Sequence, residues 1–253
     1  MLAAERHRLI LERVQQQGSV RVAALAKELT VTEETIRRDL EKLGAEGQLV
    51  RTHGGAVALA SDRTELPFDV RDAVHLPEKR AIARRAASFI NEGDVIALDA
   101  SSSAYELARC LPERPISVVT NSLAIANLLA DAAHIRLILS GGVLDGPSMG
   151  LVGALAEENL GRFNIRKLFF SCQGLDIDRG LSLTADEHGR MKRRMMDLAE
   201  QAYLLIDHSK LGVRAVEFFA NVSELDMVIT DPSAPQDAVH RMRDMGVKVE
   251  IAD

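Results

Sequence analysis

The chain has little of several residue types that would define a special class of protein. Among its 253 residues there is no tryptophan, aromatic residues make up 4%, and there are two cysteines, Cys110 and Cys172. Their separation fits neither a metal site nor a disulfide framework. No apolar run approaches the roughly 20 residues that span a bilayer, and the charged N-terminus lacks a signal-peptide core. The sequence therefore predicts a cytoplasmic protein without metal, cofactor or membrane partner.

Positive charge is also scarce, because the formal net charge is −6. This argues against a generally basic coat for nucleic acid. The distribution is uneven, however: residues 1–57 carry a net charge of +1 and the remainder −7. An acidic body would orient a weakly basic segment toward phosphates. The length and the 47% hydrophobic content allow one large or two modest globular domains.

The most informative short segment is TEETIRRDLEKL, residues 32–43. Thr32 is a suitable helix N-cap, and two glutamates follow it in the first turn. Ile36, Leu40 and Leu43 recur at helical spacing and form one buried stripe. Arg38 then points away from the stripe, on a face that also carries Thr35 and Lys42. Such a helix suits the DNA major groove, and the alternative is an ordinary solvated amphipathic helix.

The segments around this helix favour the DNA-binding interpretation. Periodicity predicts a helix over residues 2–17, a short extended link at 19–20 and a second helix over 22–29. A tight turn at 30–31 then leads into the helix at 32. Further on, LVRTHGGAV at 49–57 predicts a two-stranded wing with a glycine turn. Its Arg51 is well placed to meet a phosphate or the minor groove.

This stretch resembles the N-terminus of the DeoR family of bacterial transcriptional regulators. The resemblance rests on ER at 5–6, TEETIRRDLEKL at 32–43 and RTHGGAV at 51–57. It implies a winged helix-turn-helix domain over residues 1–57 that binds double-stranded operator DNA. The DNA contacts so expected are Thr32, Thr35, Arg37, Arg38 and Lys42 from the helix, with Arg51 and His53 from the wing.

A different organisation begins after a polar segment that contains two prolines. Residues 58–77 are interpreted as an interdomain linker, in which a few apolar side chains could pack. From residue 78 onward, helices alternate with apolar strands, which indicates a parallel sheet covered on both faces. The predicted fold is a Rossmann-like α/β domain over 78–253. The predicted helices are 78–91, 104–111 and 123–130, and the strands are 95–98, 116–119, 135–139, 167–170, 203–206, 227–229 and 247–251.

Polar residues follow five of these strands, where open parallel sheets form their ligand crevice. Serines at a helix start and paired glycines can bind phosphate through backbone N–H groups. Carboxylates accept hydrogen bonds from sugar hydroxyls, and lysines neutralise phosphate. Each feature alone is more often a cap, a turn or a solvated face. Together they predict a pocket for a phosphorylated polyhydroxy compound, with candidates Asp99, Ser101, Ser102, Ser103, Thr120, Asn121, Ser122, Gly141, Gly142, Gly174, Asp176, Lys192 and Lys210.

The resemblance to the DeoR family continues through DASSS, VVTNS, LSGG, residues 174–176 and DHSK. It implies a sensor domain similar to ribose-5-phosphate isomerase that binds a sugar phosphate as inducer. The family's acidic cluster is altered here, and Glu187 and Lys192 are assigned to its matching positions. The chain looks most like the fucose and rhamnose subgroup, which implies a 6-deoxyketose 1-phosphate. Its methyl group would contact Tyr105, Cys172 or Leu175.

The leading prediction is a homo-oligomeric repressor, dimeric or tetrameric, of a sugar-catabolism operon. A sugar phosphate would release it from its operator, and no residue is assigned a catalytic role. One alternative is a sugar-phosphate isomerase or deaminase with a fused DNA-binding domain, in which Asp176 or Glu187 would be the base. Against this alternative, no glycine-rich lysine loop follows Asp176. Another alternative is a redox regulator that uses the two cysteines.

Overall fold

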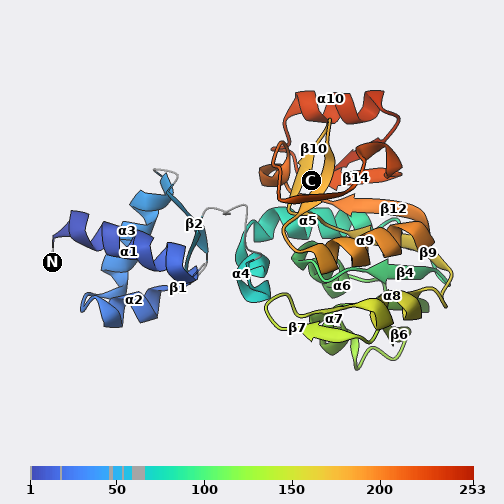
Figure 1. Ribbon diagram of the computed structural model, residues 1–253, viewed down its shortest axis with the longest axis horizontal. Coiled ribbons are helices and arrows are strands. Elements are labelled where there is room, and N and C mark those ends of the chain that lie inside the picture. The colour runs from blue at the N-terminus through green and yellow to red at the C-terminus, as the bar shows by residue number, and fades with distance from the viewer. Residues whose placement is uncertain (1, 18, 46–47, 53, 59–65) are drawn as a thin grey trace. The chain divides into compact units, whose positions relative to one another are not determined.

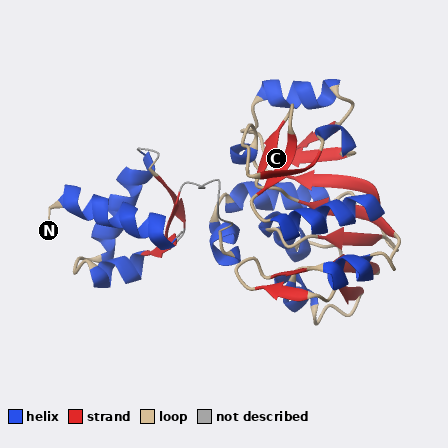
Figure 2. Cartoon of the chain, in the orientation of Figure 1, coloured by secondary structure: helices blue, strands red, loops and turns tan. Residues whose placement is uncertain are grey.

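The computed structural model describes residues 2–17, 19–45, 48–52, 54–58 and 66–253. The chain divides into two compact units, a first unit of residues 1–74 and a second unit of residues 75–253. Figures 1 and 2 show helices around a small sheet in the first unit and helices on both sides of a large sheet in the second. None of the helices within these described ranges combines the length and apolar character needed to cross a membrane.

Residues 3–58 of the first unit form three helices and a small antiparallel sheet. The predicted apolar stripe forms its core, because Ile36, Leu40 and Leu43 are at most 1% exposed and pack with Ile10 and Val14. The strands lie in the order β1-β3-β2. The elements are α1 (Ala3–Gln17), β1 (Ser19–Arg21), α2 (Val22–Glu28), α3 (Glu33–Ala45), β2 (Leu49–Thr52) and β3 (Gly55–Ala58).

The segment predicted to be only an extended link is a strand of this sheet. β1 pairs antiparallel with β3, so that Val20 lies opposite Ala56 and Arg21 opposite Gly55. A Cβ atom on Gly55 would lie 1.8 Å from the backbone oxygen of Val20. Only glycine permits this close approach, which explains the second glycine of the wing motif.

The segment predicted to be a linker contains a helix, α4 (Phe68–Ala73), and the next helix begins inside it. Its prolines precede or start helices instead of breaking them. Pro67 stands directly before α4, and Pro77 lies in the first turn of α5 (Leu76–Ala87), where a missing N–H costs nothing. Val70 is buried, as expected for a packed apolar side chain. The polar residues 59–65 lie outside the described residues.

The second unit contains the predicted parallel sheet, with seven strands in the order β15-β14-β12-β9-β4-β5-β6. Every neighbouring pair is parallel. The Rossmann-like fold class is thus confirmed. The strands are β4 (Val95–Leu98), β5 (Ile116–Thr120), β6 (Ile135–Leu139), β9 (Ile165–Phe170), β12 (Ala199–Leu205), β14 (Met227–Thr230) and β15 (Lys248–Ile251).

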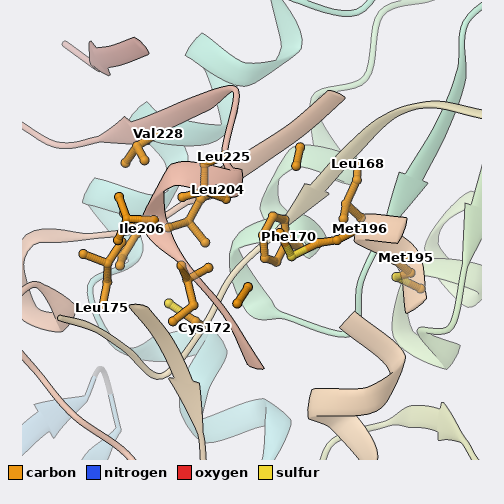
Figure 3. Close-up of a cluster of buried hydrophobic side chains, with 14 of the residues drawn as sticks. Leu168, Phe170, Cys172, Leu175, Met195, Met196, Leu204, Ile206, Leu225 and Val228 are labelled. Carbon is orange, nitrogen blue, oxygen red and sulfur yellow. The ribbon is translucent and has the colours of Figure 1, made fainter. Parts of the chain in front are cut away.

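Helices cover both faces of this sheet, and alternate strand residues point to opposite cores. Leu168 and Phe170 belong to one core, which Figure 3 shows together with Met196 of α9, whereas Phe169 belongs to the other. The first core packs against α8 (Ala154–Leu160), α9 (Asp186–Leu198) and α10 (Gln236–Asp244). The second packs against α5, α6 (Ser102–Arg109) and α7 (Leu123–Leu129) (Figure 1).

Two antiparallel pieces in the second unit were not predicted. One is a hairpin of β7 (Val143–Asp145) and β8 (Gly150–Val152). The other is a small sheet of β10 (Gly174–Asp176), β11 (Gly180–Leu183) and β13 (Glu217–Ala220). Strands of three or four residues that include glycine or a polar residue show neither an apolar run nor a hydrophobic period in sequence. Two 3-10 turns, η1 (His208–Lys210) and η2 (Val222–Glu224), complete the element order.

Candidate functional site

The exposed face of α3 presents the residues predicted to contact DNA. Thr32 precedes the helix and its hydroxyl accepts a hydrogen bond from the Thr35 amide at 3.2 Å, which is the expected cap. Arg38 projects from the side opposite to the buried stripe and Arg37 lies about 100° from the stripe, with side chains 77% and 54% exposed. Lys42 is exposed one turn further along. The helix therefore offers a polar, charged surface that carries three cations.

Each of these arginines is held by a glutamate one turn earlier. Arg37 contacts Glu33 at 2.7 Å, and Arg38 contacts Glu34 at 3.2 Å. Ion pairs at this exposure contribute only about 0.3–0.5 kcal/mol. Breaking such a weak pair costs little free energy, so each guanidinium group can leave its glutamate to bind a phosphate or a base.

A buried ionic contact joins α3 to α1 behind this surface. The Asp39 carboxylate accepts hydrogen bonds from Arg6 Nε at 2.5 Å and Nη2 at 3.0 Å, and it lies 2.9 Å from His7 Nε2. Burial raises the pKa of Asp39, but the bonds from Arg6 and His7 outweigh it, so this pKa lies below its usual value. Arg6 of the N-terminal ER motif thus helps to fix α3 against α1, a role that sequence inspection did not find.

The wing is present as β2 and β3, in which Arg51 pairs with Ala56 and Thr52 with Gly55. The strand pairing places Arg51 beside the tight turn, as the wing motif predicts. His53, the other candidate of the wing, lies outside the described residues.

In the second unit, four neighbouring strands bring polar residues to one edge of the sheet, which we call the carboxyl edge. Asp99 follows β4, Thr120 ends β5, Ser171 follows β9, and Asp207 lies just beyond β12. All four side chains belong to buried residues. Neighbouring parallel strands end together, so these residues meet although up to 108 positions separate them in sequence.

The centre of this edge is a buried ion pair between Asp99 and Lys192 of α9. Their side chains are 2% and 10% exposed. Asp99 also accepts hydrogen bonds from the Ser101 hydroxyl at 2.5 Å and the Ser171 amide at 3.3 Å. The predicted candidates Asp99, Ser101 and Lys192 are therefore brought together, and Ser171 joins them.

Lys210 approaches the same place from η1. Its Nζ lies 3.3 Å from the Ser171 hydroxyl and 3.9 Å from Asp207 Oδ2. Burial raises the pKa of Asp207, but the charge of Lys210 and the hydrogen bond from Ser209 prevail, so the carboxyl stays ionised with a lowered pKa. Ser171 is thus linked to two ammonium groups from separate elements, directly to Lys210 and through Asp99 to Lys192.

The helix-start residues divide into caps and groups with spare hydrogen-bonding capacity. Ser101 and Ser122 cap α6 and α7, and the Thr120 hydroxyl bonds the Leu98 carbonyl at 2.7 Å. For Ser101, Ser122 and Thr120, the alternative interpretation as helix caps and local backbone contacts holds. By contrast, Ser103 Oγ and Asn121 Oδ1 are buried without a hydrogen-bond partner in the described part of the chain. Unsatisfied buried polar atoms are uncommon and point to a missing ligand or water. Ser102 is buried beside them.

The glycine candidates are explained by close packing. A Cβ on Gly142, whose φ is +109°, would lie 2.6 Å from the Val152 oxygen, and one on Gly174 would lie 2.4 Å from the Val213 oxygen. Gly141 has a φ of +71°, a conformation that favours glycine. These glycines shape the loops, and no contact with the lysine pair is recorded for them.

Two carboxylate candidates lie apart from the carboxyl edge. Asp176 does not follow a strand of the parallel sheet; it ends β10, where it accepts hydrogen bonds from Arg214 Nε at 2.7 Å and the Arg179 amide at 2.9 Å. Its Oδ1 is therefore used within the β10–β11 turn, and its Oδ2 is used by Arg214, which precedes β13. The Glu187 side chain is 58% exposed and faces Arg190 at 4.0 Å. Helical periodicity explains why Glu187 lies away from Lys192, because the two residues are on different faces of α9.

His188, on the buried face of α9 that also carries Lys192, was assigned no chemistry from sequence. Its Nε2 lies 3.1 Å from Asp145 of the β7–β8 hairpin, and a Cβ on Gly150 would lie 2.8 Å from its ring. The hairpin thus packs on α9 beside the candidate site. Only the i, i+4 spacing of His188 and Lys192 would have indicated this shared face.

The cysteines are unsuited to redox sensing in this state. Burial raises the pKa of Cys172 to about 12 and that of Cys110 to about 11. Thiols with such values are protonated near neutral pH and react slowly. Within the residues that the structure describes, no group of three or more histidine, cysteine or acidic side chains is arranged to hold a metal.

Family models match both units. The family described as "DeoR-like helix-turn-helix domain" matches residues 6–62, and that described as "DeoR C terminal sensor domain" matches residues 74–232. The second match alone covers more than half of the chain. The chain belongs to the DeoR family.

Full-length relatives agree with the DeoR assignment. The chain is 39% identical over 249 residues to an uncharacterized HTH-type transcriptional regulator, YulB, of Bacillus subtilis, covering 98% of this chain and 96% of that one. It is 38% identical to the L-fucose operon activator of Haemophilus influenzae (91% and 92% covered). It is 32% identical to the glycerol-3-phosphate regulon repressor of Escherichia coli K12 (99% and 100% covered). This DeoR-family chain is a transcriptional regulator.

Solved structures resemble it more distantly. Ribose 5-phosphate isomerase A of Methanocaldococcus jannaschii matches with a TM-score of 0.40 and 18% identity, over 53% of each chain. The sorbitol operon regulator SorC of Klebsiella pneumoniae matches with a TM-score of 0.35 and 14% identity, over 81% of this chain and 90% of SorC.

Proposed function

We propose that this DeoR-family regulator represses a sugar-catabolism operon and that a phosphorylated sugar, bound at the carboxyl edge, releases it from operator DNA. One observation supports the effector site: Lys210 contacts the Ser171 hydroxyl, and Lys192, from a separate element, pairs with Asp99, which also accepts from the Ser171 amide. Two cations on neighbouring groups, together with buried polar atoms at the same strand ends that have no partner among the described residues, suit an anion that carries hydroxyl groups.

The two parts of such a ligand match different groups of the site. The phosphate would bind the ammonium groups of Lys192 and Lys210 and the hydroxyls of Ser103 and Ser171. The sugar hydroxyls would donate to the Asp99 carboxylate and to Asn121 Oδ1. Thr120, Ser101 and Ser122 would hold the backbone in place around the ligand. Asp176 and Glu187, whose side chains lie elsewhere, are not included in this site.

The sugar is proposed to be a 6-deoxyketose 1-phosphate. The L-fucose operon activator, 38% identical to this chain, supports a deoxysugar pathway. The ligand's methyl group needs an apolar contact, and half-buried Tyr105 can supply it, whereas Cys172 is buried with 4% of its surface exposed. Leu175 is fully buried in the core, so we leave it out of this contact.

We further propose that the protein binds sugars without converting them. Isomerisation needs a carboxylate that is free to take a proton beside the carbonyl. Asp99 is ion-paired with Lys192, Asp207 faces Lys210, and Asp176 is bonded to Arg214. These contacts favour binding over proton abstraction. Turnover of ribose 5-phosphate by the purified protein would contradict this part of the proposal.

For DNA binding, α3 would enter the major groove, where Arg38 and Arg37 would contact base edges or backbone phosphates. Because one α3 reads one half-site, a dimer or tetramer in the cytoplasm would bind a paired operator. The repressor relatives support this direction of control, among them the glycerol-3-phosphate regulon repressor of Escherichia coli K12.

Operator release tests the proposal. Fluorescent DNA from upstream of the gene is titrated with protein, and the complex is then challenged with a panel of sugar phosphates and their free sugars. We expect release by a deoxyketose 1-phosphate and no release by the unphosphorylated sugar. Lys210→Gln should weaken the response, whereas Lys248→Gln, an exposed lysine of β15, should leave it unchanged. DNA binding that no phosphorylated compound alters would remove the effector assignment.

A further inference from the structure

A cluster of lysine, histidine and aspartate side chains joins the candidate effector site to the point where the chain enters the second unit. We call it the relay cluster: His75, Lys79, Asp207, His208 and Lys210. Lys210 contacts both Ser171 of the candidate site and Asp207, at 3.3 and 3.9 Å. His75 and Lys79 lie at the other end, at the start of α5.

Asp207 is the central residue of the relay cluster. Its side chain is 1% exposed, and Oδ1 accepts hydrogen bonds from the amide and hydroxyl of Ser209. Oδ2 is buried without a hydrogen-bond partner among the described residues. The nearest cation recorded for Oδ2 is Lys210. The fields of His75 and Lys79 also act on this carboxylate and help to keep its pKa low. Asp207 therefore depends on positive charge from both sides.

The other end of the cluster sits on an unusual stretch of backbone. His75 has a φ of +51°, in the left-handed region, and precedes α5 as its N-cap without a side-chain capping bond. Its ring meets the ring of His208 edge-on, with centroids 5.3 Å apart. His208 is fixed by Asp231, which accepts from its amide at 2.7 Å and lies 2.8 Å from Nδ1. His75 thus rests against a rigid neighbour of Asp207, directly after residue 74, where the first unit ends.

We propose that the relay cluster transmits occupation of the effector site to the start of α5, and so to the chain that leads to the DNA-binding unit. The inference rests on the proposed effector site. An anion between Lys192 and Ser171 attracts the Lys210 ammonium away from Asp207. The buried carboxylate then interacts more strongly with Lys79 and His75, and the first turn of α5 moves toward it. Conversely, DNA binding that holds the start of α5 in place lowers the affinity for the anion, because linkage between two binding sites is reciprocal.

The test follows the imidazole signals of the full-length protein by long-range proton–nitrogen NMR during titration with inorganic phosphate. Calorimetry on the same samples gives the phosphate affinity. The chain has seven histidines, and His75→Asn identifies the signal of His75. Asparagine is chosen because it tolerates the left-handed conformation while removing the imidazole. Exposed His240 of α10 serves as the internal control.

We expect the His75 and His208 signals to shift and saturate with the calorimetric affinity while His240 stays unchanged. In Lys210→Gln, phosphate should still bind through Lys192, and the His75 signal should no longer respond. Lys248→Gln should behave as the unmodified protein. In His75→Asn, phosphate and operator affinities measured separately should stay within about twofold. The change that phosphate makes to operator affinity, about 5- to 150-fold in coupled systems, should shrink toward none.

Two other outcomes separate the relay from the effector site. If phosphate binds the unmodified protein while His75 does not respond, or if His75 responds equally in Lys210→Gln, the relay is wrong and the effector site stands. If phosphate does not bind the unmodified protein, both the effector site and the relay are wrong.

Discussion

Among single residues, Arg38 and Lys192 show how burial separates two cations that look alike in sequence. The Arg38 side chain is 77% exposed and its contact with Glu34 is a surface ion pair. The Lys192 side chain is 10% exposed and its partner Asp99 is 2% exposed. Removing an exposed cation changes little in the fold, whereas removing one partner of a buried pair leaves an uncompensated charge. The two residues therefore call for different tests.

Arg38→Ala should lower operator affinity without lowering stability. Loss of a bidentate base contact costs about 1–3 kcal/mol, while loss of the Glu34 pair costs about 0.3–0.5 kcal/mol in the fold. Fluorescence titration with operator DNA and a thermal melt measure the two effects. Glu34→Ala is the matched control, because it removes the same ion pair and keeps the arginine. Unchanged operator affinity in Arg38→Ala would exclude Arg38 from the interface.

Lys192→Met should destabilise the second unit by about 3–5 kcal/mol, because Asp99 would remain buried without its cation. The double variant Asp99→Asn/Lys192→Met should recover most of this loss, since no unpaired charge is left. Urea unfolding followed by circular dichroism measures both. A Lys192→Met protein as stable as the unmodified one would show that the pair is not closed in solution.

At the scale of elements, the contact of α1 with α3 shows how a buried carboxylate sets the position of a reading helix. Asp39 lies on α3 next to the exposed Arg38, yet its side chain is 7% exposed and bonded to Arg6. One α3 turn thus carries both a side chain of the proposed DNA surface and the ionic contact behind it. Helical geometry makes this possible, because adjacent residues point about 100° apart.

Asp39 makes the first unit sensitive to acid. Its folded pKa lies below the unfolded value of about 3.9, so its contribution is complete above that value and is lost as pH falls through the folded pKa. Asp39→Asn should destabilise the unit by about 2 kcal/mol at neutral pH. This difference should stay constant down to about pH 5 and shrink below about pH 4. Amide NMR signals of α1 and α3 during urea titrations report it; a difference independent of pH down to the acid range would contradict the assignment.

Elements also differ in how visible they are in sequence. β4 and β6 were predicted with their observed bounds, because β4 is a continuous apolar run and β6 is apolar except for Arg136, each between polar turns. β1 was not recognised as a strand, since three residues show no period and its pairing with β3 depends on Gly55, far along the chain. The β7–β8 hairpin was missed for the same reason, and with it the partner of His188.

For the whole molecule, charge is distributed unevenly along the chain. Residues 1–57 have a net charge of +1 and the remainder −7, so DNA should approach residues 1–57. One winged helix reads only a short stretch of DNA sequence. An operator with two half-sites therefore needs at least two copies of the chain. The proposed oligomer is thus a consequence of how much sequence one α3 can read.

Light scattering should give the mass of a dimer or tetramer, and binding to a two-half-site operator should be cooperative. Inserting about half a helical turn, roughly 5 base pairs, between the half-sites should weaken binding strongly, because the second α3 would face the wrong side of the duplex. Inserting a full turn, about 10 base pairs, should restore part of it. A monomeric mass together with tolerance of the half-turn insertion would contradict paired recognition.

The sequence by itself determined the fold class, the DeoR family and the buried stripe of α3, because each depends on local periodicity or on short motifs. It also indicated that polar residues follow the strands. Only the tertiary structure decided which of them meet: Asp99, Lys192 and Ser171 come together, while Asp176 and Glu187 do not. Strand order and helix rotation decide such meetings, and both depend on packing between segments far apart in the chain.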